Sequence, residues 1–304
     1  MTDLIKNVDT LNTLDQDNKI VKMNINPEKI TSENIIENLK LNIIPKDIII
    51  STMTIICKSK VIFNVKNIGY FLELRKDVIF CVNYGQYTDT KSNRTLNNIK
   101  KKRNIKNKKD KKNFYNQVSI VVFSDEGKKI NIKLFSNGSI HMTGCKDIVN
   151  SISALKNLFI QLKKIKAIYD PINNKIVEKS FVENSENLDV SKIYNFKIVM
   201  INSNFNIGFN IDRDKLYDLI TIKNIAECSY DPIIHACVNI KYDCDNKTVS
   251  IFVFESGSII ITGANNGKHI LDAYNFINKL LCTNYKQIYK SNILSNSTIL
   301  MYLA

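Results

Sequence analysis

Two stretches of the chain repeat nearly the same pattern of apolar and polar positions. Residues 134–145 read LFSNGSIHMTGC and residues 253–264 read VFESGSIIITGA, an offset of 119 positions. In each stretch a turn that ends in glycine precedes an apolar strand pattern that closes with Thr-Gly. The alignment continues into a helical pattern, where Ala154 matches Ala273. A match carried through turn, strand and helix indicates an internal duplication. Two copies favour a pseudo-symmetric domain over an open array of repeats.

The periodicity predicts the same order of elements in both copies. Alternation over short runs is typical of half-buried strands, and apolar positions three and four apart are typical of a helix. In the first copy these patterns predict strands at 47–58, 78–85, 117–124, 130–136 and 139–144, then a helix at 146–166. In the second copy they predict elements at 196–209, 215–223, 226–232, 235–243, 248–256 and 258–263, then a helix at 267–281.

Alternation along the strands assigns their side chains to two faces. In the repeated strand, Ile140 and Met142 point towards the helices, and Ile259 and Ile261 do so in the second copy. If helices cover only that side, the other side is open, and apolar groups on an open side are typical of an interaction surface. The residues predicted on this open side are Ser139, His141, Thr143, Ser258, Ile260 and Thr262, with Lys133, Phe135, Phe252 and Phe254 from the preceding strands.

Composition narrows the class of protein. The 304 residues are 44% hydrophobic and 24% charged, which is ordinary for a globular chain of one or two domains. No apolar run approaches the roughly 20 residues of a membrane span. The N-terminal sequence lacks the apolar block of a signal peptide. The seven cysteines are scattered without a C-x-x-C pair, so we expect reduced thiols in an intracellular protein with no membrane partner.

The net charge of +14 indicates an acidic partner, and more than half of it lies in one segment. Residues 100–112, KKKRNIKNKKDKK, hold nine basic residues and one acidic residue. The segment is interpreted as a solvated loop or as an arm that contacts phosphates, and the two interpretations are compatible. The basic residues that begin it are Lys100, Lys101, Lys102 and Arg103.

The order of the elements, with these motifs, resembles the TATA-box-binding protein family. Both copies carry F-x-x-G-x-x-x-x-T-G, similar to the family's LIF-x-SGK-x-x-x-TGAK. ISTMTIIC at residues 50–57 resembles VSTVNLGC, and SYDP at residues 229–232 resembles SYEP. The resemblance covers residues 46–165 and 195–283, about two thirds of the chain. The composition and the long additions are similar to divergent members that large DNA viruses encode.

The resemblance implies an α+β fold, a saddle of two pseudo-symmetric repeats whose curved antiparallel sheet carries helices on its convex face. Its concave face would bind double-stranded DNA in the minor groove, wedge phenylalanines between base steps and bend the duplex. It also implies transcription initiation in the nucleus, a viral factory or a virion, with no cofactor. By position it implies wedges at Phe135 and Phe254, groove contacts at Thr143, Thr262, Ile50, His141 and Ile260, and a phosphate contact at Lys241. The alternative for the two phenylalanines is a place in the core.

Several positions depart from the family's pattern. Where the family has asparagines that donate to the central base pairs, this chain has Ile48 and Met200. Asn202 lies two residues further along the same face, and Asn239 lies on a neighbouring strand. The second wedge position of the C-terminal copy is His235. These departures predict A·T-rich DNA binding with a relaxed sequence preference.

The spacing of the first strands predicts additional residues in the first copy. Ile48 and Met200 are 152 positions apart and the later strands are 119 apart, which leaves 33 additional residues. The basic run falls among them, where the family has the stirrup, a loop that straddles the edge of the DNA. Asp231 and Pro232 resemble the second stirrup, which contacts transcription factor IIB, so a IIB-like protein and RNA polymerase are the expected protein partners.

The copies and their flanks predict five regions. They are a polar N-terminal extension at 1–45, a first repeat at 46–167 with a basic insertion around 86–113, a connector at 168–190, a second repeat at 191–283 and a C-terminal tail at 284–304.

Other functions stay open at this point. A scaffold for transcription factors could keep the fold without specific DNA binding, and a DNA-packaging protein could bind without regard to sequence. An enzyme is not expected, because the sequence has no P-loop, G-x-G-x-x-G motif, metal-ligand cluster or nucleophile elbow. Base-repair glycosylases of related fold add a helical domain with a catalytic Lys or Asp, for which this chain has no room.

Overall fold

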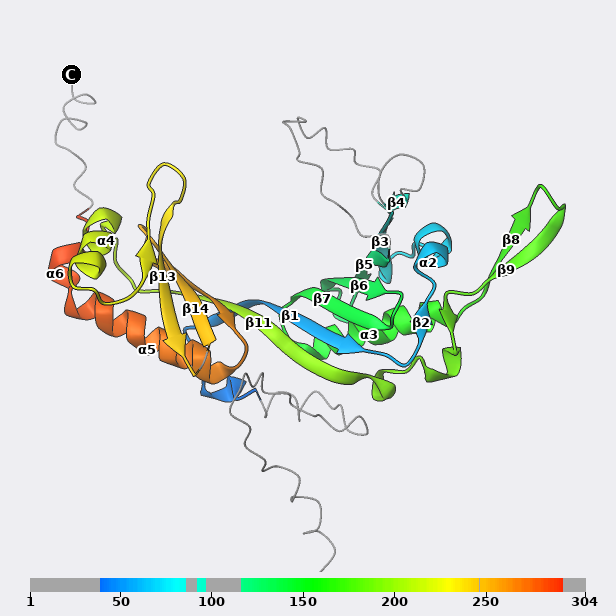
Figure 1. The fold of residues 1–304 in the computed structure, drawn as a ribbon, viewed down its shortest axis with the longest axis horizontal. Coiled ribbons are helices and arrows are strands. Elements are labelled where there is room, and N and C mark those ends of the chain that lie inside the picture. The colour runs from blue at the N-terminus through cyan, green and yellow to red at the C-terminus, as the bar shows by residue number, and fades with distance from the viewer. Residues whose placement is uncertain (1–38, 86–91, 97–115, 246, 292–304) are drawn as a thin grey trace, which may run out of the picture.

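A computed structural model of the chain describes residues 39–85, 92–96, 116–245 and 247–291, most of which build one large antiparallel sheet with helices (Figure 1). The strands of the N-terminal half are β1 Ile49–Lys58, β3 Ile79–Tyr84, β4 Ser92–Thr95, β5 Gln117–Phe123, β6 Lys129–Phe135 and β7 Ser139–Cys145. Those of the C-terminal half are β11 Tyr194–Asn206, β12 Cys228–Ser229, β13 Cys237–Cys244, β14 Lys247–Phe254 and β15 Ser258–Ala264. The eleven strands follow the order β12-β13-β14-β15-β11-β1-β7-β6-β5-β3-β4.

Two long strands, β1 and β11, pair in the middle of the sheet. Their antiparallel pairing runs from Ile49 opposite Asn204 to Lys58 opposite Tyr194. β7 pairs with the other edge of β1, and β15 pairs with the other edge of β11. The two halves therefore share one hydrogen-bonded sheet.

Alternation along the strands places the core on one face of this sheet. In β6, Ile130, Ile132 and Leu134 are at most 1% exposed, and the positions between them are half-buried. β14 repeats this pattern. Helix α3, Ile148–Leu162, packs on β5, β6 and β7, and α5, Gly267–Thr283, packs on β13, β14 and β15. Each aliphatic side chain that this burial removes from water stabilises the fold by about 1.5–3 kcal/mol.

Both long helices begin at a side-chain cap. The Asp147 carboxylate accepts a hydrogen bond from the Asn150 backbone N–H, and the Asn266 amide oxygen accepts one from the His269 N–H. The short helices are α2 Val65–Phe71, α4 Arg213–Ile222 and α6 Tyr285–Ile288, and the 3-10 turns are η2 Leu41–Ile43, η3 Ser185–Asn187 and η4 Val190–Lys192.

The hairpins that carry the repeated motif have the same register in both halves. Lys133 lies opposite His141 in β6–β7, and Phe252 lies opposite Ile260 in β14–β15. Both partners of the second pair stand 119 positions after those of the first, which is the predicted offset.

The predicted alignment of the first strands is wrong by four residues. Met53 lies opposite Cys145, and Ile201 lies opposite Ala264, which stands 119 positions after Cys145. Met53 and Ile201 are therefore equivalent, an offset of 148 positions rather than 152. The first copy has 29 additional residues relative to the second rather than 33. β1 and β11 are isoleucine-rich and pair through several register shifts, so sequence similarity alone does not fix their alignment.

Most of the additional residues lie between β3 and β5. Ser119 and Asn239 hold equivalent places in β5 and β13, 120 positions apart. Asn83 lies opposite Ser119, and Ser229 lies opposite Asn239, so these two partners are 146 positions apart. The difference assigns 26 additional residues to the stretch between β3 and β5. That stretch contains the edge strand β4 and the basic run.

The predicted connector between the halves contains strands of its own. β8, Lys166–Asp170, and β9, Lys175–Lys179, form a two-stranded hairpin that projects from the end of the N-terminal half (Figure 1). After the hairpin, β10, Val182–Glu183, pairs with β2, Ile62–Phe63, and closes against the body.

Residues assigned to the predicted N-terminal extension and to the predicted tail pack on the C-terminal half. The Gly267 N–H at the start of α5 donates to the carbonyl oxygen of Leu39 at 2.8 Å. At the other end of the chain, α6 packs against α4, and Ile211 forms a bridge with Tyr289.

The glycine of the repeated turn should tolerate no side chain. Gly257 has a φ of 76°, and a Cβ built on it would lie 2.3 Å from the carbonyl oxygen of Phe209. Gly127 is the matched control, because its φ is 74° and a Cβ there would meet nothing within 4 Å. Alanine at either position carries a left-handed backbone cost of about 1–2 kcal/mol.

Gly257→Ala should lower the free energy of unfolding by about 1–3 kcal/mol more than Gly127→Ala, because the methyl group also forces the backbone at Phe209, in the loop after β11, to shift. Urea unfolding of both variants measures this difference. Equal losses in the two variants would contradict the clash.

Candidate nucleic-acid interface

One face of the sheet lies opposite the face on which α3 and α5 pack, and we call it the open face. Its side chains alternate with the core positions of each strand and are mostly half-buried. Lys133 shares this face with His141, and Phe252 shares it with Ile260, because cross-strand partners point the same way. The residues that line it are Ser119, Asn131, Lys133, Phe135, His141 and Thr143, then Ile49, Thr52, Thr54, Met200, Asn202 and Asn204, then Asn239, Lys241, Ser250, Phe252, Phe254, Ile260 and Thr262.

In the N-terminal half, polar side chains form a hydrogen-bonded row across β5, β6 and β7. The Ser119 hydroxyl donates to Asn131 Oδ1 at 2.7 Å, and Asn131 Nδ2 donates to Thr143 Oγ1 at 3.4 Å. These bonds fix the orientation of the asparagine amide on the open face.

A second row crosses the centre of the sheet. Asn202 Nδ2 donates to Thr52 Oγ1 at 3.0 Å, and the Thr262 hydroxyl donates to Asn202 Oδ1 at 2.5 Å. An amide has two N–H donors, so Asn202 keeps one for a ligand. The sequence predicted Asn202 and Thr262 as site residues, and the structure joins them directly.

The two halves present different chemistry at equivalent positions of the open face. Where the N-terminal half has Lys133 and His141, the C-terminal half has Phe252 and Ile260. Burial lowers the pKa of His141, and the positive charge of Lys133 lowers it further, so the ring is neutral at pH 7. At this pair of positions the face is therefore polar and basic in the N-terminal half and apolar in the C-terminal half, where Lys241 on β13 supplies the basic group instead.

The two predicted wedge residues occupy the same place in each half. Phe135 and Phe254 are the last residues of β6 and β14, and both are half-buried on the open face rather than in the core. Turn bonds follow each: the Gly138 N–H donates to the Phe135 carbonyl at 3.0 Å, and the Gly257 N–H donates to the Phe254 carbonyl at 3.1 Å. The Phe135 ring also lies 4.7 Å from the His141 ring, centroid to centroid.

Two residues predicted for this face lie in or against the core, and those predictions are wrong. Ile48 precedes β1 and is 7% exposed. Ile50 packs against the core and lies opposite Ser203, which is fully buried. A register shift follows Ile50, and it is Ile49, opposite Asn204, that lies on the open face with 63% exposure. The sequence analysis missed Ile49 because a bulge cannot be seen in three consecutive isoleucines.

Strand β13 contributes two further predicted residues to the open face. Lys241 is half-buried, and its Nζ donates to the Ser250 hydroxyl at 2.7 Å. Asn239 Nδ2 makes a long hydrogen bond of 3.4 Å to Ser229 Oγ, whereas Asn239 Oδ1 is buried without a partner within the described chain.

The loop between β12 and β13 projects its side chains into solvent. The Asp231 carboxylate accepts a hydrogen bond from the Ile233 N–H at 2.9 Å, and the Asp231 carbonyl accepts one from the His235 N–H at 2.7 Å. His235 and Pro232 are exposed, and Ile233 and Ile234 are 94% and 71% exposed. The two isoleucines were missed by the sequence analysis, because isoleucine is common throughout this chain.

The basic residues Lys100, Lys101, Lys102 and Arg103 lie outside the described residues. The strand that leads towards them is anchored, because the Arg94 guanidinium of β4 donates to the Gly69 carbonyl at 2.9 Å and to the Ile68 carbonyl at 3.3 Å. These carbonyls belong to the last turn of α2, where the helix dipole favours a cation.

Two classes of site find no support in the described part of the chain. No group of three His, Cys, Asp or Glu side chains there could hold a metal ion. None of the helices described is long and apolar enough to cross a membrane.

Comparison with known proteins identifies one family. Residues 195–283 match the family described as transcription factor TFIID, or TATA-binding protein. A TATA-box-binding protein-like protein of Acanthamoeba polyphaga mimivirus is 40% identical over 263 residues, which are 79% of this chain and 66% of that protein. The chain thus spans just under two thirds of that relative. Among solved structures, Methanococcus jannaschii TBP matches with a TM-score of 0.47 and 15% identity, over 78% of this chain and 99% of that one.

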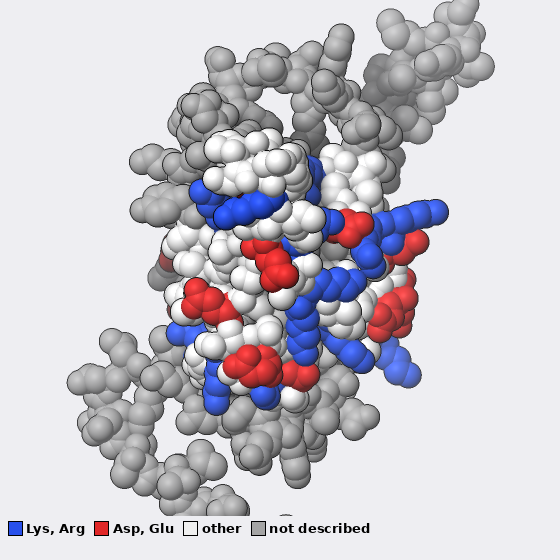
Figure 2. All heavy atoms as spheres, turned by 90° about the vertical axis from the view of Figure 1, so that its right-hand side faces the viewer, with Lys and Arg blue, Asp and Glu red and all other residues white. Residues whose placement is uncertain are grey.

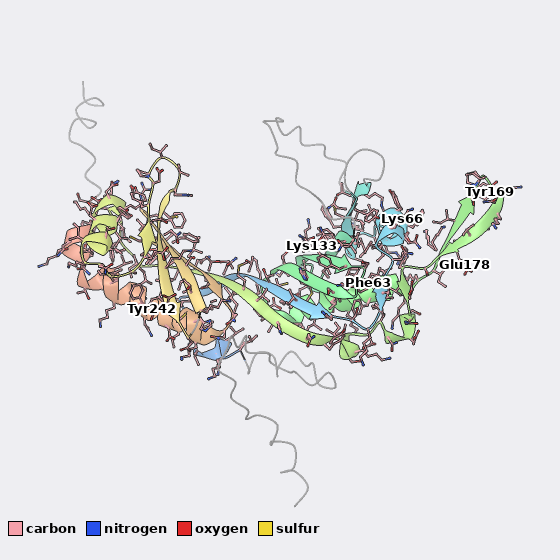
Figure 3. All side chains as sticks on the ribbon, viewed as in Figure 1. Phe63, Lys66, Lys133, Tyr169, Glu178 and Tyr242 are labelled. Carbon is pink, nitrogen blue, oxygen red and sulfur yellow. The ribbon has the colours of Figure 1, made fainter. Side chains whose placement is uncertain are left out.

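Truncation of a phenylalanine on the open face should cost less stability than truncation of one in the core. Phe254 is half-buried, whereas Phe63 is 1% exposed and lies within the body of the protein (Figure 3). Phe63→Ala should lower the free energy of unfolding by about 3–5 kcal/mol, and Phe254→Ala by about 1–2 kcal/mol. Thermal and urea unfolding measure both. If Phe254→Ala lowers the free energy of unfolding as much as Phe63→Ala does, the Phe254 ring belongs to the core and not to the open face.

Proposed function

The chain belongs to the TATA-box-binding protein family as a divergent member of the kind that large DNA viruses encode, and we propose that it is a transcription initiation factor that binds A·T-rich double-stranded DNA. The open face is the surface that would lie in the minor groove. The observation that carries the proposal is the pair Phe135 and Phe254, which stand at equivalent positions in the two halves of the open face.

The proposed architecture is a saddle built from two diverged repeats with helices on the convex side. The matched registers at an offset of 119 residues support it. The strand order also supports it. Outwards from β11 the strands are β15, β14, β13 and β12, and outwards from β1 their counterparts are β7, β6, β5 and β3. A concave open face would follow a bent duplex over its whole length.

The chemistry of the open face suits the minor groove. At A·T pairs the minor groove offers only acceptor atoms, so apolar groups with a few donors can occupy it without leaving donors unpaired. Phe252 and Ile260 supply the apolar contact, and the Thr143 hydroxyl and the remaining Asn202 N–H supply donors. The Thr262 hydroxyl already donates to Asn202, so Thr262 would contact the groove through its methyl group. A guanine would place its amino donor against these apolar groups.

Bending would depend on the two phenylalanines. Insertion of an apolar wedge between base steps costs a few kcal/mol of unstacking, which is offset by the wider contact that a bent duplex makes. Phe135 and Phe254 are held at the ends of their strands by the turn hydrogen bonds that follow them. Both rings are thus presented by rigid backbone.

Sequence preference should be relaxed. One good base contact contributes about 1–3 kcal/mol of discrimination. The central position held by Met200 has no amide donor, and the Asn202 amide is already engaged by Thr52 and Thr262. Discrimination would then rest on groove shape more than on hydrogen bonds.

Protein partners would bind at the loop between β12 and β13. Ile233 and Ile234 are exposed beside Asp231 and Pro232, and this combination favours a protein contact over a phosphate contact. A transcription factor IIB-like protein and RNA polymerase are the proposed partners, in the nucleus, a viral factory or a virion. No catalytic activity is proposed for the chain.

Binding and bending of two duplexes, one A·T-rich and one G·C-rich, separate this function from its rivals. The full chain should bind an A·T-rich duplex more tightly than a G·C-rich duplex and bend it, with fluorescence energy transfer between end labels as the measurement. Phe254→Ala should weaken binding about tenfold or more and reduce the bend, because one wedge is lost. Phe276→Ala on α5, away from the open face, is the matched control and should bend DNA like the wild type. Equal binding to all duplexes without bending would support packaging, and no binding would support a scaffold.

The basic run should set much of the salt dependence of binding. Each phosphate that it neutralises contributes about −0.9 to the slope of log affinity against log salt. Deletion of residues 97–112 should therefore flatten this slope while the melting temperature stays within a few degrees. Lys156→Ser is the control, because Lys156 is exposed on α3, on the side away from the open face. An unchanged slope after the deletion would show that the run does not contact DNA.

A further inference from the structure

The β8–β9 hairpin stands apart from the large sheet and carries exposed apolar side chains. Its two strands pair with each other and with no other described strand. Tyr169, Ile172 and Ile176 are 59%, 90% and 71% exposed, and Figure 3 shows Tyr169 on the hairpin, away from the body. A two-stranded hairpin is marginally stable in water, and additional strands stabilise it. The free edges of β8 and β9 are therefore candidate sites of strand addition.

The base and the turn hold this hairpin in a defined shape. Leu162 at the end of α3 and Phe181 before β10 are 1% and 3% exposed, so both legs are anchored in the core. At the tip, the Asp170 carboxylate accepts a hydrogen bond from the Ile172 N–H at 3.0 Å. The hairpin is thus held at its base by the core and at its tip by the turn.

The sequence of β8, KAIYD, is complementary to itself in an antiparallel arrangement. If two copies of β8 pair about Ile168, Lys166 of each copy lies opposite Asp170 of the other, and this happens twice. Ala167 then lies opposite Tyr169, a small side chain opposite a large one. Opposite charges across neighbouring strands stabilise the pair, and like charges destabilise it. The hydrogen bonds from Asn173 and from the turn N–H groups lower the pKa of Asp170, which keeps its carboxylate charged.

The other edge lacks this complementarity. β9 reads KIVEK, and antiparallel pairing about Val177 would place Lys175 opposite Lys179, so both charged pairs would be repulsive. Parallel pairing of two β8 strands would place Lys166 opposite Lys166. Of these three arrangements, only the antiparallel pairing of two β8 strands brings opposite charges together in both charged pairs.

Charges at this end of the molecule are mixed rather than of one sign. Figure 2 looks at this end and shows acidic and basic side chains interspersed over it. A surface for DNA phosphates would carry a continuous basic patch, so the pattern favours a protein surface with the same mixed charges. A second copy of the chain is such a surface.

We propose that two copies of the chain associate through the edge of β8, antiparallel about Ile168, to form the four-stranded sheet β9-β8-β8-β9. The contact is isologous, so it closes after two copies and does not propagate. Its area is small beside the roughly 1,200–2,000 Å² of stable interfaces, so the dimer is a weak one that forms in the micromolar range or above. The proposal rests on the hairpin and is independent of DNA binding.

Sedimentation velocity of the full chain without DNA, over about 1–100 μM, tests whether the chain forms this dimer. The mean mass should rise towards that of a dimer. Lys166→Asp and Asp170→Lys should each weaken association about tenfold or more, because each turns two attractive pairs into repulsive ones. An equimolar mixture of these two variants should restore association, because opposite charges then meet again. Lys146→Asp, the same charge change outside the hairpin, should leave association within twofold.

A cysteine pair tests the same geometry without relying on the turn at Asp170. Ile168 lies on the two-fold axis of the proposed dimer. Ile168→Cys would therefore bring one thiol from each copy within reach of a disulfide, and mild oxidation should link the chains. Val177→Cys, on the other strand of the hairpin, should link no more than the wild type, whose own exposed Cys282 sets the background. A chain that stays monomeric at 100 μM overturns the proposal, as does association that both charge variants leave unchanged.

Discussion

The antiparallel pairing of β1 with β11 is the interaction on which the rest of the molecule depends. Each half, taken alone, would end in a long strand with a row of unpaired backbone N–H and C=O groups. Pairing of the two edges satisfies these groups and continues the core beneath them, from Met53 opposite Ile201 to Ile55 opposite Ile198. One continuous sheet follows, and with it one open face, free of the described helices, that is long enough to hold Phe135 and Phe254 in separate halves.

The two halves show how one backbone can carry two surface chemistries. Positions towards the helices keep similar aliphatic side chains, such as Ile132 and Ile251, because close packing constrains their volume. Positions on the open face have no packing partner within the described chain that constrains them in this way. Lys133 and Phe252 can therefore occupy equivalent sites, and the face differs from one end to the other without any change in strand register.

Sequence periodicity predicted the strands of the large sheet except the edge strand β4, the two long helices and the open face, because alternation and helical spacing follow directly from burial on one side. It failed where the backbone departs from regularity. The shift after Ile50 exchanges the roles of Ile49 and Ile50, and the four-residue error between the first strands has the same cause. The β8–β9 hairpin was interpreted as a connector, because KAIYD and KIVEK alternate too briefly and with too much charge to stand out. The loop at Ile233 was missed because exposure cannot be inferred from an isoleucine in an isoleucine-rich chain.

The path of the chain through the central pair has a mechanical consequence. β1 enters from the side of the C-terminal half, where the Tyr274 hydroxyl donates to Asp47, and leaves into the N-terminal half, where the Ser59 N–H bonds to the Gly138 carbonyl. β11 runs the opposite way. A force that pulls the halves apart along these strands therefore acts in shear. It loads all the hydrogen bonds between β1 and β11 together, whereas a force across the strands would break them one after another. Separation of the halves along the strands is therefore resisted more strongly than separation across them.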